Sequence, residues 1–268
     1  MYGGVCFIVV NATWSASSDQ FISNRALVEG GVVSNIDFYK SLSLSNCLAF
    51  DNFASVGSIM SLGTAIFGLN ISNCKFESNF AFYYGGVVLK SSNLTIQAST
   101  FQNNRAHGSG AALFLLGAGK SDILYENETY VMIIDNCTFQ NNSVKYAPRD
   151  FSPSYEGAAI FSSSVRALII NSSSFVGNKA SSGGKGLDVF TCFFSLINGY
   201  LMYNFFSHLL GAIYSTRSSI NIFSSIFRNN VAETYFNEAE NRSFGGGGGA
   251  IFWMIDSSTV SADRRVSD

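Results

Sequence analysis

The sequence predicts an all-β protein, a parallel β-solenoid of about eight to nine coils. Three observations lead to this fold class. A unit of about 26 residues recurs along the 268-residue chain. Each unit holds short apolar segments that alternate with period two between glycine or asparagine residues, which is typical of β-strands. No apolar stripe of helical period is sustained. A unit this short cannot bury its apolar face alone, but stacked copies can.

The unit is clearest in residues 94–113, LTIQASTFQNNRAHGSGAAL. An apolar pair (Leu94, Ile96) is followed by Phe101, by Asn104 three residues later, and by a glycine motif that starts at Gly110. Alignment on the asparagine gives eight units: Asn24, Asn52, Asn79, Asn104, Asn142, Asn178, Asn204 and Asn230. We expect successive coils to stack in sequence order, about 4.8 Å apart.

Two apolar slots keep their register with this asparagine. Three residues before it stand Phe21, Ala49, Phe76, Phe101, Phe139, Phe175, Leu201 and Phe227. Five residues before that slot stand Ala16, Leu44, Ile71, Ile96, Ile134, Ile170, Leu196 and Ile222. Both slots are predicted to point inward and to form columns. Ala49 interrupts the phenylalanine column, and Phe50 or Phe53 is expected to compensate.

The asparagine is predicted to form a ladder. Asparagine tolerates the left-handed backbone conformation of a bend, and its amide can hydrogen-bond to the asparagine of the next coil. The glycine motif follows, where small residues let the backbone turn sharply. The motifs are Gly30-Gly31-Val32-Val33, Gly63-Thr64-Ala65-Ile66, Gly85-Gly86-Val87-Val88, Gly110-Ala111-Ala112-Leu113, Gly157-Ala158-Ala159-Ile160, Gly211-Ala212-Ile213 and Gly249-Ala250-Ile251.

The repeat covers the chain, so residues 1–268 are predicted to be one domain. No capping repeat and no signal peptide are visible, and we expect the chain to be a fragment of a longer solenoid. Insertions near 117–130, 145–156 and 233–244 hold much of the charge. They are either binding loops on a rigid scaffold or plain solvated loops.

Residues 189–216 carry no charge and are long enough to span a bilayer. Asn198, Asn204 and His208 interrupt this stretch, and Asn204 keeps the 26-residue register on both sides. We therefore expect a buried coil, with a membrane segment as the alternative.

Composition and motifs exclude several function classes. Charged residues make up 13% of the chain, the net charge is −2, and no basic patch is visible, so nucleic acid is not an expected partner. The sequence holds no nucleophile-elbow, P-loop, dinucleotide-binding or zinc motif, so we expect no cofactor and no metal. His107 and His208 are predicted to be turn or surface residues.

Cys47, Cys74 and Cys137 share one slot with Ser99 and other serines, two residues before the phenylalanine slot. A stack of small residues is the simpler interpretation. A disulfide between Cys47 and Cys74 is also possible, because adjacent coils place their Cα atoms within the allowed range.

Possible N-glycosylation sites of the form Asn-x-Ser/Thr would be used if the protein were secreted by a eukaryote. They are Asn11, Asn70, Asn93, Asn127, Asn136, Asn141, Asn171 and Asn241. Asn136 and Asn141 flank a phenylalanine slot, and we expect them to be partly shielded.

The string F-x-x-N-x-A followed by G-G-A-I resembles the repeats of the polymorphic outer membrane proteins of chlamydiae and similar repeats in protist surface proteins. The matching segments are Phe21–Asn24, Phe76–Asn79, Phe101–Asn104, Phe139–Asn142, Phe175–Asn178 and Phe227–Asn230. The resemblance implies a right-handed, pectin-lyase-like parallel β-helix with a role in adhesion. It also implies an extracellular or cell-surface location, with membrane attachment through segments outside this chain, and carbohydrate or a host or partner cell-surface protein as the partner.

The leading functional hypothesis is therefore a non-catalytic scaffold or adhesion module. The alternative is a polysaccharide lyase or glycoside hydrolase of the same fold. Sugar hydrolysis needs two carboxylates that face one site. The aspartates that could supply them fall in different slots: Asp19, Asp37, Asp51, Asp135, Asp188 and Asp256.

Overall fold

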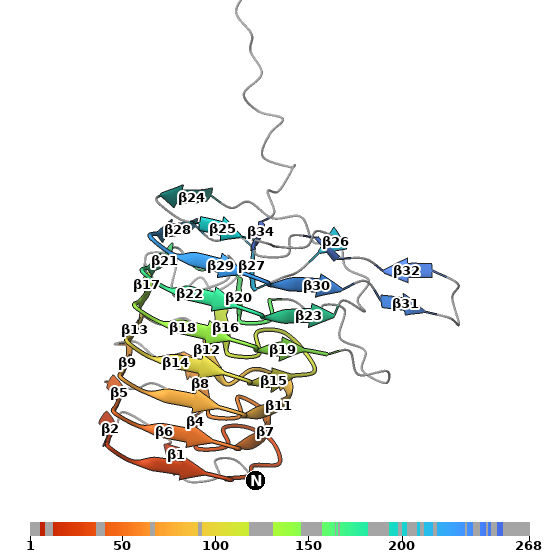
Figure 1. Ribbon diagram of the computed structural model, residues 1–268. Coiled ribbons are helices and arrows are strands. Elements are labelled where there is room, and N and C mark those ends of the chain that lie inside the picture. Colours follow the sequence, from red (N-terminus) through yellow and green to blue (C-terminus); the bar gives the residue numbers. More distant parts are fainter. Residues whose placement is uncertain are drawn as a thin grey trace, which may run out of the picture.

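The computed structural model is a parallel β-helix (Figure 1), which confirms the predicted fold class. Its described secondary structure consists of strands. The described residues are 6–8, 13–35, 41–64, 68–90, 93–117, 131–145, 157–163, 165, 167–181, 193–197, 200–202, 208–209, 212–216, 219–233, 235–237, 242–244, 246–247 and 251–253.

Four parallel sheets run along the stack, and each coil contributes about one strand to each sheet. In spatial order, the first sheet is β2 (Thr13–Ser17), β5 (Ser41–Ser45), β9 (Leu69–Ser72), β13 (Leu94–Gln97), β17 (Val131–Asp135), β21 (Ala167–Asn171), β28 (Ser219–Phe223) and β24 (Phe193–Ile197). The second is β3 (Gln20–Ile22), β6 (Leu48–Phe50), β10 (Lys75–Glu77), β14 (Thr100–Gln102), β18 (Thr138–Gln140), β22 (Ser174–Val176), β29 (Ile226–Arg228) and β25 (Tyr200–Met202).

The third and fourth sheets close each coil. The third is β7 (Phe53–Val56), β11 (Phe80–Tyr84), β15 (Arg105–Ala106), β19 (Ser143–Val144), β23 (Lys179–Ser181) and β30 (Val231–Glu233). The fourth is β1 (Cys6–Ile8), β4 (Val33–Asn35), β8 (Met60–Thr64), β12 (Val87–Lys90), β16 (Leu113–Leu116), β20 (Ile160–Ser163), β27 (Ile213–Thr216) and β34 (Ile251–Trp253).

Two short pairs lie outside these sheets. β31 (Tyr235–Asn237) and β32 (Arg242–Phe244) form an antiparallel hairpin within the predicted insertion at 233–244. β26 (His208–Leu209) pairs with β33 (Gly246–Gly247), so His208 lies in a strand. The insertion residues 118–130 and 146–156 lie outside the described residues.

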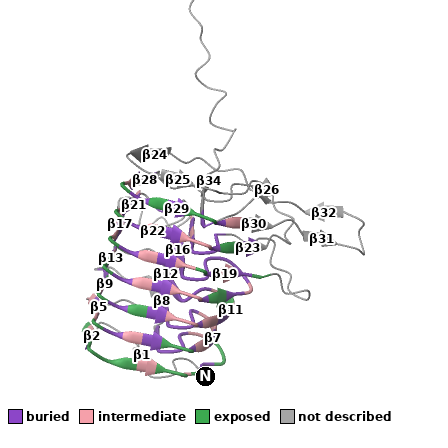
Figure 2. Cartoon of the chain, in the orientation of Figure 1, coloured by how far each residue is buried: buried purple, intermediate pink, exposed green. Residues whose placement is uncertain are grey.

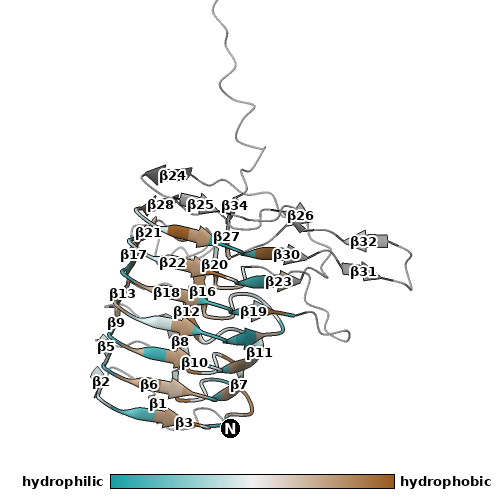
Figure 3. Ribbon diagram, viewed as in Figure 1, coloured by the Kyte–Doolittle hydropathy of each residue, from teal (hydrophilic) through white to brown (hydrophobic). Residues whose placement is uncertain are grey.

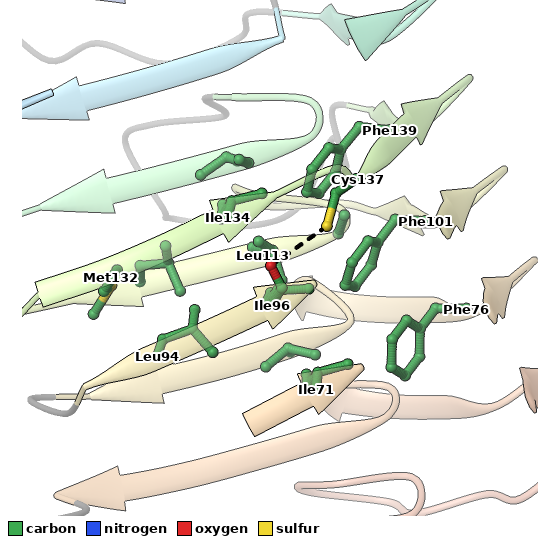
Figure 4. Close-up of a cluster of buried hydrophobic side chains, with 14 of the residues drawn as sticks. Ile71, Phe76, Leu94, Ile96, Phe101, Leu113, Met132, Ile134, Cys137 and Phe139 are labelled. Atoms are coloured by element: carbon green, nitrogen blue, oxygen red, sulfur yellow. Dashed lines mark hydrogen bonds between the residues drawn. The ribbon is translucent and has the colours of Figure 1, made fainter. Parts of the chain in front are cut away.

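The two apolar slots form the columns that the sequence predicts. In the second sheet Phe76 pairs with Phe101, and the pairing continues through Phe139. These rings are fully buried, and Figure 4 shows them one above another beside the isoleucine column. Phe101 and Phe139 stack with centroids 5.0 Å apart and ring planes 4° apart. In the coils that Figure 2 colours, buried segments recur at the same place, and apolar segments recur along the stacked strands in Figure 3.

Neither Phe50 nor Phe53 fills the gap in the column at Ala49. Phe50 is 39% exposed, and Phe53 packs on the outer face against Phe80. On the opposite wall of this coil, Ile59 is buried in the same core as Ala49. It occupies the column that the neighbouring coils fill with Val32 and Gly86. Its Cδ1 atom lies 3.1 Å from the place that a Cβ atom on Gly86 would occupy, so Ile59 fills the space that this glycine leaves open.

The left-handed bends do not lie at the asparagines of the ladder, which corrects the expectation from the sequence. Positive φ angles occur one residue earlier, as at Asn103 (56°), and again at the bend between the first two sheets, as at Asn136 (50°). The ladder asparagine itself lies just after the bend, with its side chain pointing into the core. Asparagine is therefore favoured at this position by the hydrogen bonds of its side chain and not by its tolerance of a positive φ.

Ala98 occupies one of these bends with a φ of 45°. The left-handed conformation costs an alanine roughly 1–2 kcal/mol, and asparagine tolerates it better. Asn73 and Asn136 hold the equivalent position in the neighbouring coils. Ala98→Asn is therefore expected to raise the free energy of unfolding by about 1 kcal/mol, measured by urea denaturation. Gln97→Asn, one residue earlier in strand conformation, is the control, and an equal gain there would contradict the bend argument.

The second coil turns at Gly57 and not at the predicted Gly63-Thr64-Ala65-Ile66 motif. Gly57 has a φ of 61°, and a Cβ atom there would lie 2.2 Å from the carbonyl oxygen of Met60. Met60 pairs with Val33 and Val87, so Gly57-Ser58-Ile59-Met60 is the equivalent motif. Gly63 and Thr64 belong to β8. Because Ser58 is polar, Gly57-Ser58-Ile59-Met60 resembles the glycine motifs of the other coils less than Gly63-Thr64-Ala65-Ile66 does.

The coils do not all stack in sequence order, which is the main departure from the prediction. β21 pairs directly with β28, and β24 lies on the far side of β28. The unit at 193–202 therefore forms the outer layer, beyond the unit at 219–230. The inner unit is the better match, because Phe227 continues the ring stack on Phe175, whereas residue 201 is a leucine. The described part of the chain contains no helix with the length and hydrophobicity needed to span a bilayer.

Candidate functional site

The asparagine ladder runs unbroken through seven coils. In each step the backbone N–H and the Nδ2 amide of one asparagine donate to the Oδ1 atom of the next. Asn79 donates in this way to Asn104 at 3.1 and 3.0 Å, and Asn104 donates to Asn142 at 3.1 and 3.0 Å. The ladder consists of Asn24, Asn52, Asn79, Asn104, Asn142, Asn178 and Asn230.

The second proton of each amide is also used. Asn104 Nδ2 donates to the Phe76 carbonyl oxygen at 3.0 Å, and Asn142 Nδ2 donates to that of Phe101 at 2.9 Å. Both donors and the acceptor of Asn104 are therefore paired in a fully buried position. A network in which every group is satisfied stabilises the fold, whereas a broken one is costly. Asn204 lies outside the described residues, and the ladder passes from Asn178 to Asn230.

Cys47, Cys74 and Cys137 are free thiols that form hydrogen bonds, which corrects the Cys47–Cys74 disulfide hypothesis. Cys47 N donates to Cys74 Sγ at 3.4 Å, and the Cys74 thiol donates to the Ser72 carbonyl oxygen at 3.2 Å. Ser99 continues the column by accepting from Cys74 N at 3.1 Å. Side chains in such an in-register column point in the same direction, and disulfide geometry requires them to point toward each other.

Burial raises the pKa of the Cys74 and Cys137 thiols to about 11. In the unfolded chain the pKa of a cysteine thiol is about 8.5, so between pH 8.5 and about 11 the folded state binds more protons than the unfolded state. The free energy of unfolding should therefore fall as the pH rises from about 8.5 to 11. Serine fits this slot, as at Ser99, so the Cys74→Ser/Cys137→Ser variant should lose less stability over this range in urea denaturation. Equal pH slopes for the variant and the wild type would contradict the assignment.

A pocket of about 560 Å³ lies beside the ladder, on the outer face of the third sheet and the bend before it. This volume is within the range of small-molecule sites, roughly 300–1,000 Å³. We call it the Arg105 pocket. It is lined by Asp51, Ser78, Phe80, Asn103, Arg105, Ala106, His107 and Lys145.

Aromatic rings form one wall of the Arg105 pocket. His107 packs edge-on against Phe80 and Phe82, with ring centroids 5.1 and 5.2 Å apart. Phe53 extends this row below Phe80 at 5.6 Å. His107, predicted to be a turn or surface residue, lies in the turn after β15 but is half-buried. Its Nδ1 atom is buried and has no hydrogen-bond partner among the described groups.

Two exposed cations lie at the Arg105 pocket. Arg105 pairs with Phe80 in the third sheet, and Lys145 N donates to the Ala106 carbonyl oxygen at 2.9 Å, so the two side chains belong to adjacent coils. Neither cation forms an ion pair within the described part of the chain, where Lys75 and Glu77 form one at 2.6 Å. The carboxylate of Asp51 accepts a hydrogen bond from the Ser23 hydroxyl at 2.9 Å. The sequence could not reveal this group, because the three charges come from three coils.

The described sequons lie on the surface. Asn70, Asn93, Asn136 and Asn141 are exposed, so the expected shielding of Asn136 and Asn141 is wrong. Both occupy bends with a positive φ, which turns their side chains outward. Asn171 is half-buried at the end of β21. Asn11, Asn127 and Asn241 lie outside the described residues.

The carboxylates do not gather into a cluster with metal-binding geometry. In the described residues, no three histidine, cysteine, aspartate or glutamate side chains come together in a way that could hold a metal ion. Asp37, Asp188 and Asp256 lie outside these residues. A comparison with known protein families, curated proteins and solved structures finds no match to this chain.

Proposed function

We propose that this protein is a non-catalytic, surface-displayed or secreted β-helix that acts as a scaffold or adhesion module. The observation that carries this proposal is the composition of the Arg105 pocket. Its lining combines an aromatic ring, neutral hydrogen-bonding groups and two cations with a single carboxylate, Asp51. Hydrolysis of a glycosidic bond uses a pair of carboxylates about 5–10 Å apart. A lining of this kind is better suited to holding a ligand than to cleaving one.

The rest of the rod supports a display role. Its interior is filled by columns of phenylalanine, isoleucine and asparagine, which hold the coils in fixed register. The outward slots are occupied by residues such as Ser43 and Thr95, whose replacement leaves the core untouched. A rigid core with freely variable outer positions is the usual basis of a binding scaffold.

One observation favours a polysaccharide lyase as the second candidate. Arg105 and Lys145 could offset the charge of an acidic sugar beside the pocket.

The two functions differ in whether the bound polysaccharide is cleaved. The purified chain should be incubated with neutral and acidic polysaccharides and assayed for new reducing ends and unsaturated products, and its adherence to cultured cells should be measured in parallel. Adherence without cleavage supports the proposal. Cleavage that Arg105→Ser abolishes would replace it with the lyase.

A further inference from the structure

We infer that the Arg105 pocket binds an anionic glycan, meaning a sugar chain that carries carboxylate or sulfate groups. This inference deepens the proposed adhesion function and rests on it. The sequence as a whole is slightly acidic, with a net charge of −2. Against that background, the pocket gathers Arg105 and Lys145 from adjacent coils with no carboxylate partner in the described residues. An arginine guanidinium can hold a carboxylate or sulfate by two parallel hydrogen bonds.

The remaining lining matches the other parts of a sugar. Phe80 presents an apolar surface against which the C–H face of a sugar ring can pack, and His107 holds that ring edge-on from the side. Ser78 and Asn103 stand at the bend column of successive coils and offer neutral hydrogen-bonding groups at the coil spacing. The lining spans four coils, from Asp51 to Lys145, or roughly 14 Å along the stack. An elongated ligand lying along the stack would therefore meet the Asp51 carboxylate at one end, then the Phe80 ring, and then the cations Arg105 and Lys145.

The same face is unsuited to a peptide that binds by adding a strand. β11 is paired on both sides, with β7 and β15, and β15 is paired with β11 and β19. The backbone groups of these interior strands are used within the sheet, so a peptide finds no free edge here. The pocket offers side chains alone, which favours a ligand that is recognised through its own hydroxyl and anionic groups.

The test uses the full chain and four immobilised probes: heparin, polygalacturonate, neutral dextran and polyglutamate. We expect binding to heparin or polygalacturonate that weakens as salt is added, and no binding to dextran. Arg105→Ser/Lys145→Ser should weaken binding about tenfold or more, because it removes both anion contacts. Arg228→Ser is the matched control. It removes an exposed cation from β29, outside the pocket, and should leave binding unchanged.

A Phe80→Ser variant separates a glycan from a free anion. It should weaken binding to the polysaccharide without changing competition by inorganic sulfate. Equal loss in the Arg228→Ser control, equal binding to polyglutamate, or full competition by sulfate at matched anion concentration would each overturn the inference. If the glycans do not bind but cell adherence persists, the pocket assignment fails alone. If they bind and are cleaved, the ligand class stands and the non-catalytic function fails.

Discussion

Replacement of Asn104 by leucine is expected to lower the free energy of unfolding by about 4 kcal/mol. The side chain of Asn104 makes four hydrogen bonds. It accepts from the N and Nδ2 atoms of Asn79, and it donates to the Phe76 carbonyl oxygen and to Asn142 Oδ1. Leucine removes all four and leaves two donors of Asn79 without partners in a fully buried place. Each unpaired buried group costs roughly 1–3 kcal/mol.

Gln102→Leu is the control for this experiment. Gln102 lies two residues earlier, half-buried in the outward slot of β14 between Glu77 and Gln140. The change to leucine there should stay within about 0.5 kcal/mol. Urea denaturation followed by circular dichroism measures both variants. If Asn104→Leu were as stable as Gln102→Leu, the ladder would not be a source of stability.

Phe139→Ala is expected to cost about 3–5 kcal/mol. The Phe139 ring is completely buried and stacks between Phe101 at 5.0 Å and Phe175 at 4.7 Å, with ring planes 4° apart on both sides. Alanine leaves a cavity in the middle of the column. The surrounding coils cannot collapse into it, because the ladder beside it fixes their spacing. The stability loss should therefore lie toward the upper end for such a substitution.

The matched change is Phe50→Ala in the outward slot of β6. Phe50 is 39% exposed, so its truncation opens no internal cavity. We expect a loss of less than about 1 kcal/mol, measured by the same denaturation experiment. A double variant, Phe139→Ala with Ala159→Ile, tests whether a larger side chain on the opposite wall of the same coil can fill the cavity. Partial recovery of stability is expected, and a further loss would show that the opposite wall cannot supply the volume at this coil.

The sequence predicted the columns because each is specified by one slot that recurs through the whole chain. Ile96 and Phe101 keep the same distances from Asn104 that their equivalents keep in other units, and a register shift by one residue would turn all of them outward. Positions of the bends were harder. The left-handed residue changes identity from coil to coil, from Asn136 to Ala98, so no single residue type marks it.

The sequence could not predict the order of the coils or the Arg105 pocket, for a different reason. Units 193–204 and 219–230 have the same internal spacing, so periodicity alone cannot tell which of them stacks on Phe175. Direct stacking of the later unit follows from packing, because a ring fits onto a ring better than a leucine does. The Arg105 pocket depends on which residues of different coils become neighbours after the bends, and Asp51 and Lys145 are 94 positions apart in the sequence.

The asparagine ladder has a polarity. Along the row, each Nδ2 group donates one hydrogen bond to the asparagine of the coil on the C-terminal side, from Asn24 to Asn52 and onward to Asn230. The Oδ1 atom of each accepting asparagine therefore faces the N-terminal side. A coil inserted in the reverse direction would set oxygen against oxygen or N–H against N–H. The row therefore fixes one direction for every coil that joins it, and a reversed coil would leave buried amide groups without partners.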